Sequence, residues 1–430
     1  MNTAQPRRVE PVTGPLHALV DSIPGSKSIA NRALVCAALA EGRSSLRNLP
    51  GGDDTVAMLR CIATLGARVS DGESMVVAVE GTGGSLRPGP LLLHAGLAGT
   101  TSRFVTALAA LGPGPYTIDG DPPLRARPMG PLHDALVTLG AVVTASDGAG
   151  RLPVVIAAGD LHGGRIALAG DVSSQFVTAL MLIGPYLAGG LDIALTTPLV
   201  SRPYVEMTAA VMGSFGVSGV SIAEDRIVVP AGRYQAADLT IEPDASSASY
   251  LFGAAAICGG DVTVLGLGAS SLQGDAAFVD LLASMGCMVE RDAVSTSVRS
   301  TGVLRGVDTD MADISDTVPT LAVVAPFASS PTRITGIGFI RRKESDRIGD
   351  VVRELVRCGV RAHEQPDGMT IEPSSPVGAS VRTHHDHRLA MAFALLGLRV
   401  PGIEIEDPGV VSKSWPGFWD ELCGLARSTG

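Results

Sequence analysis

Hydrophobic and polar residues alternate along this chain in two patterns that recur about every 70 residues. The first pattern is an amphipathic helix, then a glycine, then a valine-rich strand. It covers residues 55–69, 128–143, 204–217, 275–289 and 346–360, with glycines at Gly66, Gly140, Gly216, Gly286 and Gly359. A glycine directly after a helix is the usual left-handed cap, so each segment is predicted to end its helix there. We predict a truncated sixth copy at residues 415–425.

The second pattern is a short polar cluster that opens a strongly apolar helix. The six clusters are Ser26-Lys27-Ser28, Gly99-Thr100-Thr101-Ser102, Ser173-Ser174-Gln175, Ala245-Ser246-Ser247, Ser315-Asp316-Thr317 and Asp386-His387-Arg388. Self-similarity at a fixed period is typical of repeat architectures. The sequence therefore predicts the α/β class, with six similar α/β units of roughly 70 residues each.

Six such repeats exceed what one hydrophobic core normally serves, so we predict two lobes of three repeats each. An equal division places the chain crossovers at Pro24-Gly25 and at Glu242-Pro243-Asp244, both of which are chain-breaking sequences. Lobe I is then predicted to comprise residues 1–23 and 244–430, and lobe II residues 24–243. The N-terminal strand belongs to lobe I in this scheme.

Composition excludes several classes of protein. With 46% hydrophobic and 18% charged residues, the chain is neither disordered nor fibrous. Its net charge of −10 argues against a role in binding nucleic acid. The N-terminus lacks the apolar segment of a secretion signal, and the uncharged stretch 172–191 contains polar residues, a proline and a Gly-Gly step. We therefore expect a cytoplasmic protein that binds no membrane.

The six cysteines form no Cys-x-x-Cys pair, and we expect buried, reduced thiols. Three histidines gather at His384, His385 and His387. Metal binding there is an alternative, but the helix that follows supplies no further ligand at matching spacing. We predict neither a metal nor a cofactor.

The polar clusters at the helix starts have two interpretations. Serine and threonine at such positions commonly cap helices and need do nothing more. Helix N-termini also present unpaired N–H groups and a partial positive charge, so six of them facing one cleft would form an anion receptor. Several clusters also carry a cation, which favours anion binding. Lys27 and Arg32 are spaced to reach a shared anion from adjacent turns.

Only three of the 33 basic residues are lysine, namely Lys27, Lys343 and Lys413. In an arginine-rich chain, arginine readily replaces a surface lysine, but not a lysine that must act as a compact charge or a proton donor. All three lie at polar junctions that open or precede helices. We interpret them as active-site residues, with chance retention as the alternative.

Two further segments carry candidate chemistry. The segment Arg341–Arg347 combines four cations with two carboxylates, and Lys343 and Arg347 share a face if a helix has begun there. The alternative is a solvated helix start. Asp316 precedes an uncharged stretch, and its carboxylate is either an N-cap or a general base.

With these residues in view, the chain resembles the enolpyruvyl transferase family, and within it the branch that acts on shikimate 3-phosphate. The resemblance runs in order through nearly the whole chain. Its marks are Pro24 to Ser28 with Asn31-Arg32, Gly99-Thr100 with Arg103, Arg127-Pro128, Ser173 to Phe176, Ser201 to Tyr204, Asp244 to Tyr250, Lys343 to Arg347, Asp386 to Arg388, and Lys413. It implies a two-lobed inside-out α/β barrel that binds its ligands in the cleft between the lobes.

The resemblance also implies which residues meet each substrate. Shikimate 3-phosphate would be held by Lys27, Ser28, Arg32, Ser173, Ser174, Gln175, Ser201, Tyr204, Asp316 and Lys343. Phosphoenolpyruvate would be held by Lys27, Gly99, Arg127, Gln175, Arg347, Arg388 and Lys413. The implied reaction is addition followed by elimination of phosphate, with Asp316 as base, Glu344 as acid and Lys27 as a participant. We expect a monomer, with glyphosate as a candidate inhibitor.

The sequence departs from the family pattern at Leu97, Phe104, Phe339 and Val411. Three alternatives stay open at this point. One is an enolpyruvyl transferase acting on UDP-N-acetylglucosamine, although residues 112–127 lack the reactive cysteine of that relative. The others are a paralogue of secondary metabolism and a non-catalytic protein that binds phosphorylated ligands.

Overall fold

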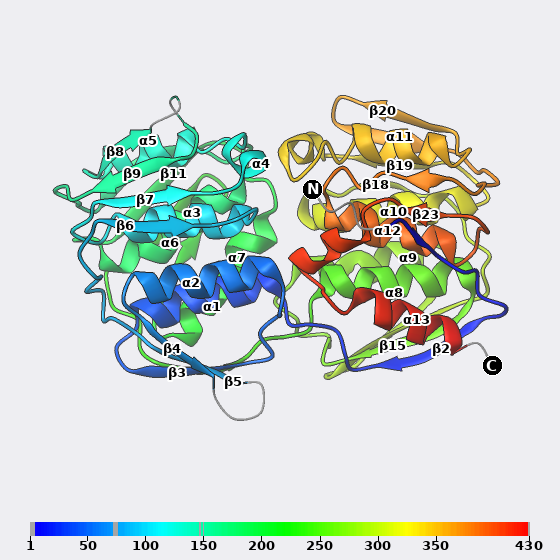
Figure 1. Ribbon diagram of the computed structural model, residues 1–430, viewed down its shortest axis with the longest axis horizontal. Helices are drawn as coiled ribbons and strands as arrows, with labels where there is room; N and C mark the ends of the chain where they lie inside the picture. Colours follow the sequence, from blue (N-terminus) through cyan, green and yellow to red (C-terminus); the bar gives the residue numbers. More distant parts are fainter. Residues whose placement is uncertain (1–4, 72–75, 146–147, 149, 429–430) are drawn as a thin grey trace. The chain divides into compact units, whose positions relative to one another are not determined.

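The computed structural model describes residues 5–71, 76–145, 148 and 150–428. The chain divides into two compact units (Figure 1). We call residues Met1–Pro24 and Pro243–Gly430 the terminal unit, and residues Gly25–Glu242 the central unit. Each unit has its own hydrophobic core.

Each unit is built from three small sheets, and five of the six sheets share one strand order. In each of these five, a parallel pair is followed by two antiparallel neighbours. The central-unit sheets are β14-β3-β5-β4 (Asp238–Thr240, Arg43–Arg47, Val76–Glu80, Arg68–Asp71), β6-β7-β9-β8 (Leu91–His94, Tyr116–Asp119, Val154–Ala157, Val142–Ala145) and β10-β11-β13-β12 (Gly164–Ala169, Leu191–Thr197, Arg226–Val229, Ser221–Ile222).

The terminal unit repeats this pattern twice in full. Its four-stranded sheets are β2-β15-β17-β16 (Leu16–Val20, Gly260–Leu265, Ser295–Ser300, Met288–Arg291) and β18-β19-β21-β20 (Asp308–Asp310, Thr332–Thr335, Gly368–Ile371, Ala362–Gln365). The sixth sheet has three strands, β1-β23-β22 (Arg7–Arg8, Glu404–Ile405, Ser380–Val381). The parallel pair β22-β23 is present, and the N-terminal strand β1 occupies the place beside it. The predicted six-repeat α/β fold is therefore confirmed.

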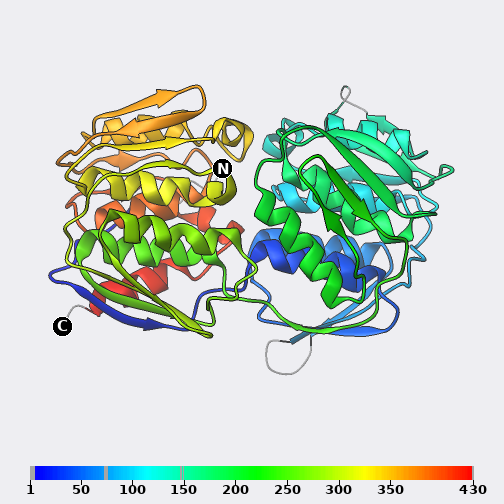
Figure 2. The same ribbon diagram turned by 180° about the vertical axis from the view of Figure 1, so that it is seen from behind.

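The polar clusters open the inner helices, as predicted. These helices are α1 (Lys27–Leu39), α3 (Gly99–Ala109), α6 (Ser174–Ile183), α8 (Ala245–Cys258), α10 (Val318–Val324) and α12 (His387–Gly397). Every residue of α8 and of α12 is buried. Because the helices lie inside and the sheets lie outside them (Figure 2), each unit has the expected inside-out arrangement.

The amphipathic helices end where their glycines predicted. They are α2 (Asp53–Thr64), α5 (Gly130–Thr138), α7 (Arg202–Ser214), α9 (Phe278–Met285), α11 (Gly349–Arg357) and the truncated copy α13 (Phe418–Arg427). All five predicted glycine caps have positive φ, from +77° at Gly359 to +117° at Gly66. The remaining short helices are α4 (Pro122–Arg125), η1 (Gly184–Tyr186), η2 (Gly274–Ala277), η3 (Ala312–Thr317), η4 (Ala325–Phe327), η5 (Gly338–Arg342) and η6 (Pro408–Lys413).

Two other expectations can be compared with the structure. Among the residues that the structure describes, no helix is both long and apolar enough to cross a membrane. Five cysteines are buried free thiols, as predicted, but the expectation is wrong for Cys423, which is exposed. Cys423 lies on the short, last amphipathic helix, where fewer elements cover the chain.

Candidate functional site

In the central unit, the start of α1 carries the first candidate cation. Ser26 caps the helix through its side chain, and Lys27 is the first helical residue. The Lys27 Nζ atom lies 3.2 Å from a carboxylate oxygen of Asp54, at the start of α2, and only 14% of the Lys27 side chain is exposed. The neighbouring helix start therefore fixes the ammonium group in place.

Arg32, one turn later, is buried and joins the three helices α1, α6 and α7. Its guanidinium donates to the hydroxyls of Thr208 (2.8 Å) and Thr178 (3.3 Å) and to the carbonyls of Ser28 (2.7 Å) and Tyr204 (3.0 Å). Burial lowers the pKa of Arg32 to about 10. The ring of Phe104, a departure from the family pattern, lies 5.6 Å from this guanidinium.

The start of α3 is shaped by two arginines. Arg103 donates to the carbonyl of Gly99 at 2.8 Å and to that of Pro128 at 3.3 Å. A Cβ atom on Gly99 would lie 2.5 Å from an Arg127 nitrogen and 2.6 Å from an Arg103 nitrogen. A side chain at Gly99 would therefore displace both guanidinium groups.

The starts of α6 and α7 complete the central group. Ser173 caps α6 by accepting from the backbone N–H of Gln175, and the Gln175 amide donates to Thr100 at 3.3 Å. Ser201 is buried just before α7 and adopts left-handed backbone conformation, with φ +55°. Strain of this kind in a non-glycine residue is characteristic of functional sites. Tyr204 follows in the first turn of α7, where its carbonyl accepts from Arg32.

In the terminal unit, three cations converge on Asp316. Its carboxylate accepts from Arg347 at 2.8 Å and from Arg388 at 2.6 Å, and Lys343 lies at 3.9 Å. Two interpretations made from the sequence are wrong here. The side chain of Asp316 does not cap α10. No helix has begun at Lys343, since α11 starts only at Gly349. Asp316, rather than a shared helical face, brings Lys343 and Arg347 together.

Arg347 is the centre of this network. Only 1% of its side chain is exposed, and it also donates to Asp386 at 2.7 Å and to Glu344 at 2.8 Å. Burial alone lowers the pKa of Arg347, but the charges of Asp386, Glu344 and Asp316 outweigh it and hold the pKa above its ordinary value. Lys413 lies 3.4 Å from the other oxygen of Glu344.

All three lysines of the chain thus pair with carboxylates, namely Asp54, Asp316 and Glu344. At least three-quarters of each lysine side chain is buried, because the exposed fractions are 14%, 24% and 9%. This placement agrees with the interpretation that these lysines are not ordinary surface residues.

Sequence reasoning missed two acidic members of the site. Asp275, in η2, is buried and accepts a short hydrogen bond from the hydroxyl of Ser246. Burial and the nearby charge of Asp316 raise the pKa of Asp275 to about 7. Asp386, which belongs to a recognised cluster, caps α12 and holds Arg347. The polar step Gln273-Gly274-Asp275 inside an apolar repeat was the available signal for Asp275.

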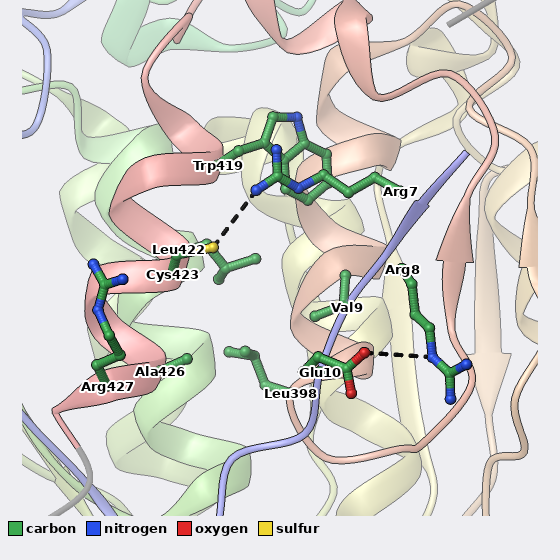
Figure 3. A pocket seen from close by; sticks show the side chains of 10 residues that line it. All are labelled: Arg7, Arg8, Val9, Glu10, Leu398, Trp419, Leu422, Cys423, Ala426 and Arg427. Carbon is green, nitrogen blue, oxygen red and sulfur yellow. Dashed lines mark hydrogen bonds and ion pairs between the residues drawn. The ribbon is translucent and has the colours of Figure 1, made fainter. Parts of the chain in front are cut away.

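A metal centre and a cavity are two other kinds of site that the described residues could form. In the described part of the chain, no group of three or more His, Cys, Asp and Glu side chains could hold a metal ion. A cavity of about 260 Å³ lies between β1 and α13 in the terminal unit (Figure 3), and none of its lining residues belongs to the predicted set. Arg7 lies over Trp419 there and donates to the thiol of Cys423.

Six α/β repeats divided between two units define an α/β protein of the enolpyruvyl transferase class. The chain belongs to the EPSP synthase (3-phosphoshikimate 1-carboxyvinyltransferase) family, whose sequence model matches residues 12–422.

Similar proteins support this membership. The 3-phosphoshikimate 1-carboxyvinyltransferase of Nostoc punctiforme is 44% identical over 407 residues, which cover 94% of this chain and 95% of the relative. That of Syntrophobacter fumaroxidans is 42% identical over 418 residues, covering 96% and 98%. A solved structure of EPSP synthase from Acinetobacter baumannii, 26% identical, superposes with a TM-score of 0.83 and covers 98% of both chains.

Proposed function

We propose that this protein is a transferase of the shikimate pathway, which transfers the enolpyruvyl group of phosphoenolpyruvate to the 5-hydroxyl of shikimate 3-phosphate and releases phosphate. One observation carries the proposed mechanism. A single buried guanidinium, that of Arg347, binds both Asp316 and Glu344 at 2.8 Å. Because one cation holds both carboxylates, Asp316 and Glu344 are fixed close together, as a base and an acid that act on the same pair of substrates must be.

The central unit supplies cations and helix N-termini to anionic groups. Lys27, Ser28, Arg32, Ser201 and Tyr204 would hold shikimate 3-phosphate, together with Ser173, Ser174 and Gln175 at the start of α6. Phosphoenolpyruvate would meet Lys27, Gly99, Gln175 and Arg127. Both ligands are multiply charged anions, which charge-assisted hydrogen bonds from arginine, lysine and helix N-termini bind well. Arg32 also donates to oxygens of α1, α6 and α7, so these contacts hold its guanidinium in place for the ligand.

The terminal unit supplies the proton transfers. In the addition step, Asp316 accepts the proton of the 5-hydroxyl as its oxygen bonds to C2 of phosphoenolpyruvate, and Glu344 donates a proton to C3. In the elimination step, C3 returns a proton to Glu344, the C2–O bond to phosphate breaks, and the leaving phosphate takes the proton held by Asp316, so both carboxyl groups regain their starting states. Lys343 would hold shikimate 3-phosphate beside Asp316, and Arg347, Arg388 and Lys413 would stabilise the charge on phosphoenolpyruvate.

We also propose that residues of both units act on one pair of ligands, in a cleft between two lobes. The assignments above divide the contacts to phosphoenolpyruvate between the central and the terminal unit. If the chain is cut where it passes between the units, at residues 24–25 and 242–243, phosphate release should be lost even if both pieces fold.

The alternative substrates considered from the sequence are not favoured. The relatives at 39–44% identity bear the name 3-phosphoshikimate 1-carboxyvinyltransferase. A purely ligand-binding role has no support from the site, because Lys27, Asp316 and Glu344 are all present. Inhibition by glyphosate, a monomeric state and a cytoplasmic location stay predictions.

A phosphate-release assay tests the proposal. The purified protein with shikimate 3-phosphate and phosphoenolpyruvate should release inorganic phosphate without added metal. The same assay with UDP-N-acetylglucosamine in place of shikimate 3-phosphate is the matched control and should give none. Release only in the control would overturn the assignment.

A further inference from the structure

We propose that Glu354 and His384 are positioning residues, which set the orientation of Arg347 through Asp386. This inference rests on the proposed function, because Arg347 is there assigned to phosphoenolpyruvate. Neither residue belongs to the set that the sequence predicted. Both lie in the terminal unit, in the stretch of chain between Arg347 and Asp386.

The segment that delivers Asp386 to Arg347 has an unusual backbone. It runs from β22 to α12, and two consecutive residues in it, His384 and His385, adopt left-handed conformation with φ +51° and +58°. Neither is glycine, so this conformation costs free energy and persists only where the surroundings hold it. Asp386 follows directly, is fully buried, and accepts from Arg347 at 2.7 Å.

The carboxylate of Glu354 supplies that hold. Glu354 lies on α11 and is fully buried. One oxygen pairs with the Nε2 atom of His384 at 2.9 Å, and the other accepts from the backbone N–H of Arg382 at 3.1 Å and from Arg357 at 2.8 Å. A single carboxylate thus binds two points of the segment that carries Asp386.

The same face of α11 also contacts the backbone beside Arg347, which is the other residue of the ion pair. Asp350 lies four residues before Glu354, so the two side chains share one helical face. Asp350 accepts from the backbone N–H of Asp346 at 3.1 Å, next to Arg347, and lies 3.5 Å from the Nδ1 atom of His384. Helix α11 therefore aligns both chain segments that meet at Arg347 and Asp386.

Kinetics of two His384 variants separate positioning from simple packing. Asparagine tolerates left-handed conformation, but its side chain is too short to reach Glu354. His384→Asn is expected to raise KM for phosphoenolpyruvate about tenfold or more and KM for shikimate 3-phosphate by less than about threefold. The amide N–H of glutamine can reach Glu354. His384→Gln should therefore have a KM for phosphoenolpyruvate no more than about threefold above wild type.

His385→Asn is the matched control. Its backbone is also left-handed, its side chain is 80% exposed, and no buried carboxylate contacts it in the described structure. It should leave both KM values near wild type. An unchanged KM for phosphoenolpyruvate in His384→Asn, or an equal rise in His385→Asn, would overturn the inference. If His384→Asn does not fold, Glu354→Gln, which keeps one acceptor oxygen, should show the same selective rise.

A measurement without substrate keeps the inference separate from the proposed function. The backbone N–H of Arg388 donates to Asp386 at 2.9 Å, so its hydrogen exchange reports the position of that carboxylate. We expect faster exchange at Arg388 in His384→Asn and no change in His385→Asn. An inactive wild-type protein would contradict the proposed function, whereas unchanged exchange at Arg388 would contradict the positioning role.

Discussion

Arg32 in the central unit and Arg347 in the terminal unit are both buried cations near helix starts, yet their partners differ. Arg32 donates to two hydroxyl and two carbonyl oxygens. Arg347 donates to three carboxylates, those of Asp316, Glu344 and Asp386. The neutral partners leave the charge of Arg32 uncancelled, whereas the charges around Arg347 are largely balanced within the protein.

The difference suggests a division of labour between two units built from the same repeat. A surface whose cations keep their charge attracts anionic substrates. A network of carboxylates and cations can instead exchange protons. We therefore expect changes in the central unit to act mainly on binding, and changes to the carboxylates of the terminal unit that transfer protons to act mainly on the chemical step.

Removing a carboxylate from the terminal unit should have the largest effect. Asp316→Asn and Glu344→Gln are each expected to lower kcat roughly 10²–10⁴-fold, as is usual when a general acid or base is lost. Because Glu344 is proposed to transfer a proton and not to bind either substrate, both KM values of Glu344→Gln should stay within about threefold of wild type. Steady-state phosphate release measures all three constants. Retention of more than about a third of kcat in either variant would contradict the assigned roles.

Replacing lysine with arginine tests both units at once. Arginine keeps the charge but spreads it over a planar fork and cannot give up a proton. Lys27→Arg and Lys413→Arg are each expected to lower kcat/KM at least tenfold, which is about 1.4 kcal/mol. If the division of labour holds, Lys413→Arg, next to Glu344, should lose mainly kcat.

Arg60→Lys, on an exposed position of α2, is the control for these variants and should behave as wild type. Thermal unfolding of all three proteins should also be compared. A fall in melting temperature that matches the loss of activity would make the lysines structural instead.

Adding one methyl group in the central unit should impair binding selectively. The Cβ atom of Gly99→Ala would lie 2.5 Å from a nitrogen of Arg127, so this guanidinium must move. We expect KM for phosphoenolpyruvate to rise roughly tenfold, with a smaller change in kcat. Gly213→Ala in α7 is the control, because nothing lies within 4 Å of its added Cβ atom. A loss confined to kcat in Gly99→Ala would contradict the comparison.

The last prediction concerns stability against pH and not activity. In the folded protein the pKa of Asp275 is raised to about 7, while an unfolded aspartate titrates near 3.9, about three units lower. Between these values the folded state holds a proton that the unfolded state has released, so stability falls as pH rises. Asp275→Asn should reduce the loss of stability between about pH 4 and pH 7, measured by urea unfolding. Asp420→Asn, at an exposed position of α13, should keep the wild-type slope.

Much of the architecture could be predicted from the sequence because it depends on local signals. The 3.6-residue periodicity, the polar helix starts and the capping glycines act over a few residues and recur in every repeat. They predicted six repeats and the starts of the inner helices. The restriction of lysine to three positions likewise indicated residues that the structure places against carboxylates.

The partners of those residues were decided only by the tertiary structure. Asp316 and Arg388 are 72 residues apart, and Arg347 and Asp386 are 39 apart. Which carboxylate meets which cation depends on how neighbouring repeats pack, and no short sequence pattern encodes that packing. The same reason explains why Asp275 and Glu354 escaped prediction: only burial, together with contacts to side chains that are distant in the sequence, gives these two residues a role.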